Sequence, residues 1–175
     1  MRSKIKALLK LNKTLSPPPQ ERSGLFLPIG SDKRYDVLLL AEMPSMNKTK
    51  DKNFSAHNFH ATERDSFFRK MLVKYGLSGV YVTDIVKRRA TPRKPTKHEI
   101  EKWLPFLKKE IAILNPSIVI AIGWRTYESF LLYVNPYLDS VFHHDFIYHY
   151  CSRVTRAKFE SRLRDVVAKY HLSRQ

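Results

Sequence analysis

A run of apolar residues from Val37 to Ala41 leads directly into Glu42 and a proline turn at Pro44. Short apolar runs bounded by turn residues are typical of strands that are buried on both faces, as in a parallel sheet. The strand has to end before Pro44, because proline has no backbone N–H to donate to a neighbouring strand. The sequence therefore predicts a strand over residues 36–41 with a carboxylate at its carboxyl end.

The rest of the chain alternates between helix and strand patterns. Further strands are expected over residues 80–86, 117–123 and 141–150. Apolar residues at helical spacing occur in residues 67–75, 100–114, 127–134 and 159–170, and a short basic helix is expected within residues 1–15. This order predicts an α/β fold, a three-layer α/β/α sandwich with a mainly parallel four-stranded central sheet. Residues 1–35 would be a basic extension packed on, or leading into, a domain of residues 36–175.

The charge of the chain indicates which class of molecule it binds. Its 32 Lys and Arg residues against 16 Asp and Glu give a formal net charge of +16, which favours nucleic acid. A membrane partner is not expected, since no apolar stretch approaches the ~18 residues of a membrane span. The apolar part of Met1–Lys10 is too short for a signal peptide. Cys151 is the single cysteine, which excludes an internal disulfide and fits a cytoplasmic protein.

Several reactive side chains follow the predicted strands. The carboxyl ends of parallel strands meet at one edge of a sheet, where ligands collect. That edge would gather Glu42, Asp84, Gly123 and His149. Two carboxylates and a histidine beside a cationic loop suggest hydrolytic chemistry on nucleic acid. The ordinary alternatives are that Glu42 is a salt-bridge or helix N-cap partner and that His149 is a hydrogen-bonded structural residue.

Cations cluster after the second predicted strand and before the last helix. We expect these side chains to contact DNA phosphates, although a solvated surface is the alternative. The cations in question are Lys87, Arg88, Arg89, Arg93, Lys94, Arg153 and Arg156. A metal hypothesis is permitted by His143, His144, Asp145 and His149. However, neighbours on a strand point to opposite faces, so His143 and His144 cannot easily converge on one ion. No metal and no cofactor are therefore expected.

Three motifs carry a resemblance to a known family. They are Ala41-Glu42-Met43-Pro44-Ser45, Val82-Thr83-Asp84-Ile85-Val86-Lys87 and Leu114-Asn115-Pro116. With them the chain resembles the uracil-DNA glycosylase superfamily, most of all its thermostable bacterial and archaeal branches, over about residues 36–167. The closing His-Pro-Ser turn of that family is matched only loosely, at His149. The iron–sulfur cysteines of one related branch are absent.

The resemblance implies a monofunctional glycosylase that hydrolyses the N-glycosidic bond of a deaminated base, such as uracil or hypoxanthine, in double- or single-stranded DNA. We expect it to act as a monomer. Glu42 would lie beneath the sugar, orient water and stabilise the developing cation, while His149 would donate a hydrogen bond to the base. Backbone amides between Met43 and Ser45 would hold the other base oxygen. Phe59, or else Phe54, would stack on the extruded base, unless it is only a core anchor of its loop.

Departures from the family pattern bear on the substrate. Ala41 and Ser45 replace glycines of the first turn, and Asp84 stands where uracil readers have asparagine. An asparagine amide both donates and accepts hydrogen bonds, whereas an ionised aspartate only accepts. Asp84 therefore favours a base edge richer in donors, such as that of hypoxanthine. The alternative is that Asp84 pairs with Lys87 or Arg88 and only shapes the loop.

Two other functions are compatible with the same residues. A non-catalytic nucleic-acid-binding protein would keep the fold and the basic edge without turnover. A metal-dependent nuclease would use Glu42, Asp84 and the histidines as ligands.

Overall fold

The computed structural model describes residues 2–14, 34–44, 63–87, 94–139, 141–150 and 153–173. Its strands are β1 (Arg34–Ala41), β2 (Val80–Asp84), β3 (Ile118–Ile122) and β4 (His143–Ile147). Its helices are α1 (Arg2–Lys13), α3 (Glu63–Lys74), α4 (Lys97–Leu114), α5 (Trp124–Tyr133) and α6 (Arg156–Lys169), with a short 3-10 helix at Asn135–Tyr137.

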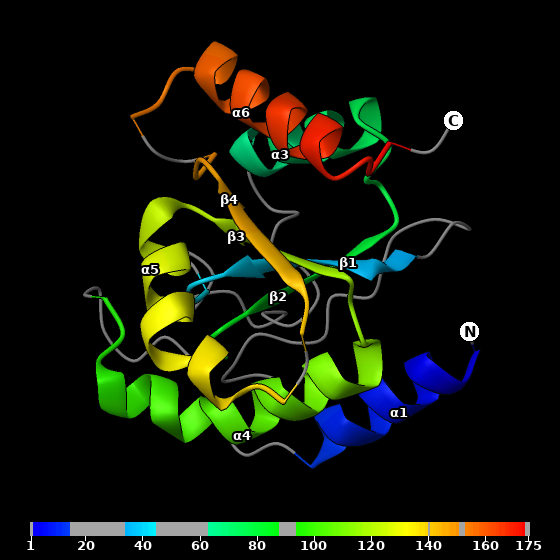
Figure 1. The fold of residues 1–175 in the computed structure, drawn as a ribbon, viewed down its shortest axis with the longest axis vertical. Helices are drawn as coiled ribbons and strands as arrows, with labels where there is room; N and C mark the ends of the chain where they lie inside the picture. Colours follow the sequence, from blue (N-terminus) through cyan, green and yellow to red (C-terminus); the bar gives the residue numbers. More distant parts are fainter. Residues whose placement is uncertain are drawn as a thin grey trace.

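The four strands form one parallel sheet in the order β2-β1-β3-β4. Figure 1 shows the sheet between two layers, with α3 and α6 on one side and α1, α4 and α5 on the other. The predicted α/β/α sandwich with a four-stranded parallel sheet is thus confirmed. The strand predicted over residues 80–86 ends earlier, at Asp84, and residues 85–87 form the turn that follows it.

Each face of the sheet has its own apolar core. Val37 and Leu39 pack toward α3 and α6, whereas Leu38 and Leu40 pack toward α4 and α5. Every residue of β3 is likewise buried. Strands covered on both faces need apolar residues at every position, which explains the continuous apolar runs in the sequence.

Helix α4 begins and ends as its sequence predicts. Thr96 accepts a hydrogen bond from the backbone N–H of Glu99 at 3.3 Å, and Glu99 accepts one from the backbone N–H of Thr96 at 2.7 Å. This reciprocal capping box satisfies two N–H groups that have no partner within the helix. Asn115, in the left-handed conformation at φ 46°, ends the helix before Pro116.

Helix α1 packs on α4. Leu8 is 1% exposed, and the ammonium of Lys4 donates to the carbonyl oxygen of Leu114 at 2.5 Å.

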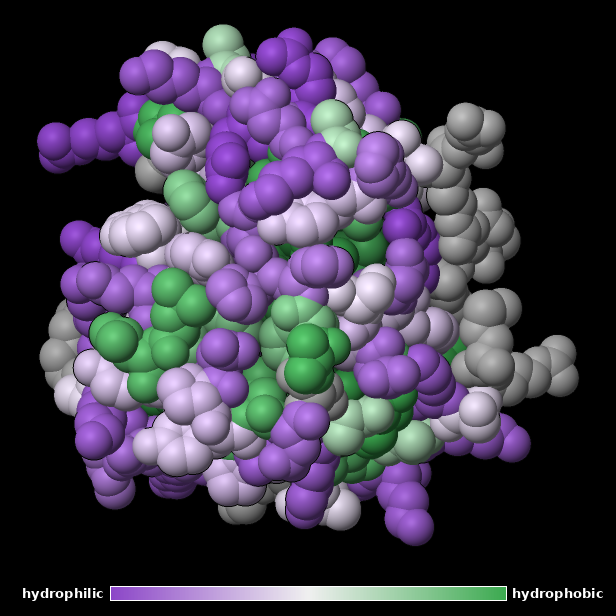
Figure 2. Space-filling view, in the orientation of Figure 1, coloured by the Kyte–Doolittle hydropathy of each residue, from purple (hydrophilic) through white to green (hydrophobic). Residues whose placement is uncertain are grey.

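Figure 2 shows hydrophilic side chains over much of the face that carries α6, while hydrophobic residues gather over α5. None of the helices that the structure describes combines the length and apolar character needed to cross a bilayer.

Candidate active site

The carboxyl ends of the four strands meet at one edge of the sheet, as expected for parallel strands. Ala41 at the end of β1 is paired with Asp84 at the end of β2. On the other side of β1, Ile122 at the end of β3 is paired with Ile147 at the end of β4. Every turn that was predicted to carry a functional residue therefore starts from this edge.

Glu42 is the first residue after β1. It is half-buried, and its backbone carbonyl accepts a hydrogen bond from the N–H of Val86 at 3.0 Å. The carbonyl of Ala41 accepts another from the N–H of Ile85 at 2.8 Å. These two bonds tie the turn after β1 to the turn after β2, so the backbones that carry Glu42 and Asp84 are held side by side.

Asp84 ends β2 and is 1% exposed. A carboxylate at this depth is costly to bury unless polar groups compensate for the lost water. It lies at the same edge of the sheet as Glu42, because Ala41 is paired with Asp84. Met43, in the turn after β1, is partly buried against the core on the α4 side of the sheet.

Lys87 occupies a different environment from the one predicted. It is 2% exposed, and its ammonium lies 2.5 Å from a carboxylate oxygen of Glu110 on α4. It also donates to the hydroxyl of Thr83, and Tyr81 donates to Glu110 at 2.7 Å. An ammonium enclosed in this way is not presented to a phosphate at the surface. The phosphate contact predicted for Lys87 is therefore wrong. Lys87 instead supports the turn after β2.

His149 follows β4 and lies against the turn after β3. Gly123 has φ of 100° and ψ of 145°, a conformation that is open almost only to glycine. A Cβ on Gly123 would lie 3.2 Å from the Cβ of His149, so glycine also permits this close approach. The histidine ring is stacked on Tyr150, with ring centroids 5.0 Å apart.

The surroundings of His149 favour its neutral form. Burial lowers the pKa of the imidazole, and the nearby carboxylate of Asp65 raises it only in part. The residue is nonetheless exposed at the surface of the structure. A neutral imidazole donates one hydrogen bond and accepts one, and it can exchange protons with water at this edge.

Asp65 and Tyr150 form a support that sequence reasoning missed. The hydroxyl of Tyr150 donates to Asp65 at 2.8 Å, and the Tyr150 ring is stacked on Phe68 at 4.6 Å. Asp65 is 3% exposed. Its spacing to Phe68 and Leu72 places all three on the buried face of α3, so a carboxylate within an apolar stripe was the available signal.

Some predicted site residues lie outside the residues that the structure describes. They are Ser45, Phe54, Phe59, Arg88, Arg89 and Arg93. Among the other predicted cations, Lys94, Arg153 and Arg156 are exposed. The guanidinium of Arg156 lies 5.1 Å from the centroid of the Phe67 ring, which holds it at the start of α6.

Two side chains of the metal hypothesis, Asp145 and His144, are engaged by protein partners. Asp145 accepts hydrogen bonds from Arg162 and, at 3.0 Å, from Lys169. A ring nitrogen of His144 lies 2.9 Å from the hydroxyl of Tyr127. Within the described part of the chain, no group of three or more His, Cys, Asp or Glu residues is arranged to hold a metal ion.

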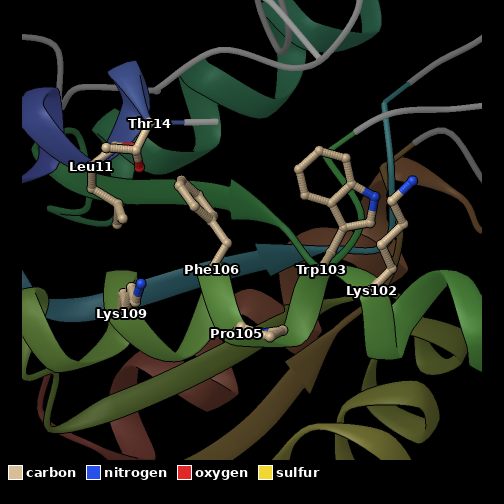
Figure 3. Close-up of a pocket in the computed structure, with 7 residues that line it drawn as sticks. All are labelled: Leu11, Thr14, Lys102, Trp103, Pro105, Phe106 and Lys109. Atoms are coloured by element: carbon tan, nitrogen blue, oxygen red, sulfur yellow. The ribbon is translucent and has the colours of Figure 1, made fainter. Parts of the chain in front are cut away.

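A cavity of about 220 Å³ lies between α1 and α4 (Figure 3). Its lining consists of Leu11, Thr14, Lys102, Trp103, Pro105, Phe106 and Lys109. Neither Glu42 nor Asp84 nor His149 lines it. The cavity is therefore separate from the edge where the candidate catalytic residues gather.

The family model of the uracil DNA glycosylase superfamily matches residues 27–174. The chain belongs to this superfamily. The match runs from before β1 to beyond α6, so it includes all four strands and the turns that follow them. The resemblance carried by the sequence motifs is thereby confirmed. No curated protein matches the chain.

Membership in the uracil DNA glycosylase superfamily associates this fold with action on DNA and with base-releasing hydrolysis. The edge that carries Glu42, Asp84 and His149 lies entirely inside the matched residues, whereas α1 precedes them. The matched residues thus include all three candidate catalytic residues.

Proposed function

We propose that this protein is a monofunctional DNA glycosylase that hydrolyses the N-glycosidic bond of a deaminated base, such as uracil or hypoxanthine. Base excision repair is the process that requires such an activity. Membership in the uracil DNA glycosylase superfamily supports the reaction class. The proposal also implies an intracellular protein that encounters DNA.

The arrangement of Glu42, Asp84 and His149 carries the proposal. Glu42 follows β1 and Asp84 ends the adjacent β2, whereas His149 follows β4, which lies beyond β3 from β1. Neighbouring strands are about 4.8 Å apart, so the ends of β1 and β4 are separated by about 10 Å. A sugar and its base fit between a carboxylate and a histidine at this separation.

Glu42 would act on the sugar. Breaking the bond between C1′ and the base nitrogen leaves an oxocarbenium-like sugar, while the bonding electrons go to the base. A carboxylate ~4 Å from that cation, at an effective dielectric of ~20, stabilises it by ~4 kcal/mol. If the whole effect is expressed in the transition state, it accelerates the reaction by about a thousandfold. Glu42 would also accept a proton from the water that attacks C1′.

His149 would act on the departing base. A neutral imidazole N–H that donates to a base oxygen stabilises the negative charge that develops there. The direction in which burial shifts the pKa of His149, downward, favours the neutral ring that this role requires. Tyr150 and Asp65 would hold the ring in place through the stack and hydrogen bond described above.

The remaining predicted residues would bind the base and the DNA backbone. Asp84 would read the base edge, together with backbone amides between Met43 and Ser45 and a stacked Phe59 or Phe54. Phosphates would be bound by Lys94, Arg153 and Arg156, with Arg88, Arg89 and Arg93. The burial of Lys87 against Glu110 argues against a phosphate role for that residue.

The test uses oligonucleotides that each carry one uracil, hypoxanthine, xanthine or mismatched thymine, in single strands and in duplexes. The proposal predicts abasic sites that break only after alkaline treatment, with activity retained in EDTA. Direct strand breakage that EDTA abolishes would indicate a nuclease instead. Retarded DNA mobility without either product would indicate a binding protein.

A further inference from the structure

The start of α5 presents a large aromatic side chain to solvent. Trp124 is 57% exposed, whereas Trp103, the other tryptophan of the chain, is 6% exposed. A tryptophan left in water forgoes the stabilisation that its large apolar area would provide if it were buried. One exposed side chain is ordinary, but an exposed aromatic that belongs to a larger surface indicates a partner.

Trp124 is part of such a surface. Its ring centroid lies 5.2 Å from that of Phe146 on β4, edge to face, and 5.8 Å from that of Tyr127. Phe146 in turn contacts Tyr148 at 6.1 Å. Tyr127, Phe146 and Tyr148 are all half-buried. We call Trp124, Tyr127, Phe146 and Tyr148 the α5–β4 aromatic surface. Its contacts hold the Trp124 ring in place while more than half of its area stays open.

The α5–β4 aromatic surface begins at the candidate active site. Trp124 directly follows Gly123, the residue against which His149 packs. Arg125 is exposed next to Trp124, whereas the guanidinium of Arg162, which pairs with Asp145, packs 4.5 Å from the centroid of the Phe146 ring. The surface is therefore continuous with the edge where Glu42, Asp84 and His149 gather.

We infer that the α5–β4 aromatic surface binds nucleobases of the DNA strand next to the excised nucleotide, with Trp124 as the stacking platform. Every base has a π-face that can stack on an aromatic ring, and cationic side chains bind the phosphates between the bases. A second copy of this chain is a poorer occupant, because two proteins of net charge +16 repel each other. The inference depends on DNA being the partner but not on which base is removed.

Tryptophan fluorescence tests the contact directly. Acrylamide quenching would be measured for the wild type and for Trp124→Phe, each without DNA and at saturation with an undamaged single strand or an undamaged duplex. The Trp124→Phe variant keeps a ring but leaves the shielded Trp103 as the one remaining tryptophan, so excitation that is selective for tryptophan reports on Trp103 alone. We expect DNA to protect the wild type from acrylamide and to leave quenching of the variant unchanged. Equal quenching of the wild type with and without saturating DNA would overturn the inference.

Affinity gives a second readout. Trp124→Ala should weaken DNA binding by about tenfold, within the range measured for loss of one stacked base. Leu132→Ala is the matched control, because Leu132 is 58% exposed on the same helix but two turns further from the edge. Equal affinities of the two variants would contradict the stacking role.

The two proposals fail in different ways. If DNA shields Trp124 but no lesion is excised, the binding surface stands and the proposed glycosylase activity does not. If bases are excised while Trp124 remains as accessible to acrylamide as in the free protein, the proposed glycosylase activity is supported. The DNA strand then does not contact the α5–β4 aromatic surface.

Discussion

Asp84 places a buried carboxylate at the end of β2, where the superfamily resemblance leads one to expect an asparagine. Asp84→Asn would restore a group that donates to a base carbonyl as well as accepting from a base N–H. The ratio of single-turnover excision rates for uracil over hypoxanthine should therefore rise, by up to about tenfold for one hydrogen bond of ~1–1.5 kcal/mol. Asp165→Asn, at an exposed position on α6, serves as the control. An unchanged ratio would remove Asp84 from base reading.

His149 gives the protein a defined dependence of stability on pH. Its pKa in the folded protein is lowered by burial, so the unfolded chain, with an ordinary histidine pKa of about 6.5, binds this proton more readily. The contribution of His149 to stability is therefore complete above about pH 6.5 and declines as the pH falls below that value. Urea unfolding at a series of pH values should show this decline for the wild type and a smaller one for His149→Gln. Parallel curves for the two proteins would contradict the assignment.

Helix α4 supports the turn after β2 through buried hydrogen bonds. Glu110 accepts hydrogen bonds from Tyr81, Thr83 and Lys87, and all four residues are buried. This network connects the end of β2 to the C-terminal part of α4. Because the N–H groups of residues 85 and 86 also bond to the end of β1, the network supports the whole turn between the two candidate carboxylates.

Lys87→Met should destabilise the protein strongly. The substitution keeps most of the apolar stem but leaves the Glu110 carboxylate buried without its cation, which typically costs roughly 3 kcal/mol. Urea unfolding measures the loss. Lys74→Ala, which breaks the more exposed pair of Lys74 with Glu160, should cost much less. A loss no larger than that of the control would show that the buried pair does not support the fold.

The sequence predicted the elements well because their signals are local. The apolar run of residues 37–41 and the capping box of Thr96 with Glu99 each involve neighbouring residues, and both are found in the structure. The phosphate role predicted for Lys87 followed from its position next to Arg88 and Arg89 in the sequence. Its real partner, Glu110, lies 23 residues further along on the buried stripe of α4.

Contacts over long sequence separations explain the missed support of His149. Asp65 and Tyr150 are 85 residues apart, so only the packing of α3 near the end of β4 brings them together. The buried carboxylate of Asp65 was visible as an irregularity in an apolar stripe, but nothing near it in the sequence identified its partner.

Of the many cations of the molecule, those near the carboxyl edge of the sheet should contribute most to the electrostatic binding of DNA. Replacing Arg153 and Arg156 by alanine should flatten the slope of log K for DNA against log salt by about 0.9 for each phosphate that the protein no longer neutralises. Lys6→Ala with Lys10→Ala removes the same charge from exposed positions on α1 and should leave the slope unchanged. Equal effects of both double variants would mean that DNA binding depends only on the net charge of the protein and not on where the cations lie.

Glu42 is proposed to act on the sugar of a bound nucleotide at the carboxyl edge of the sheet. The most direct test compares wild type, Glu42→Gln and the exposed control Glu128→Gln in single-turnover excision and in DNA affinity. Glutamine keeps the shape but removes the charge, so excision should fall at least about tenfold and by as much as about a thousandfold. Affinity should stay close to that of the wild type and of Glu128→Gln. Undiminished excision, or losses of excision and affinity that are equal, would contradict the claim.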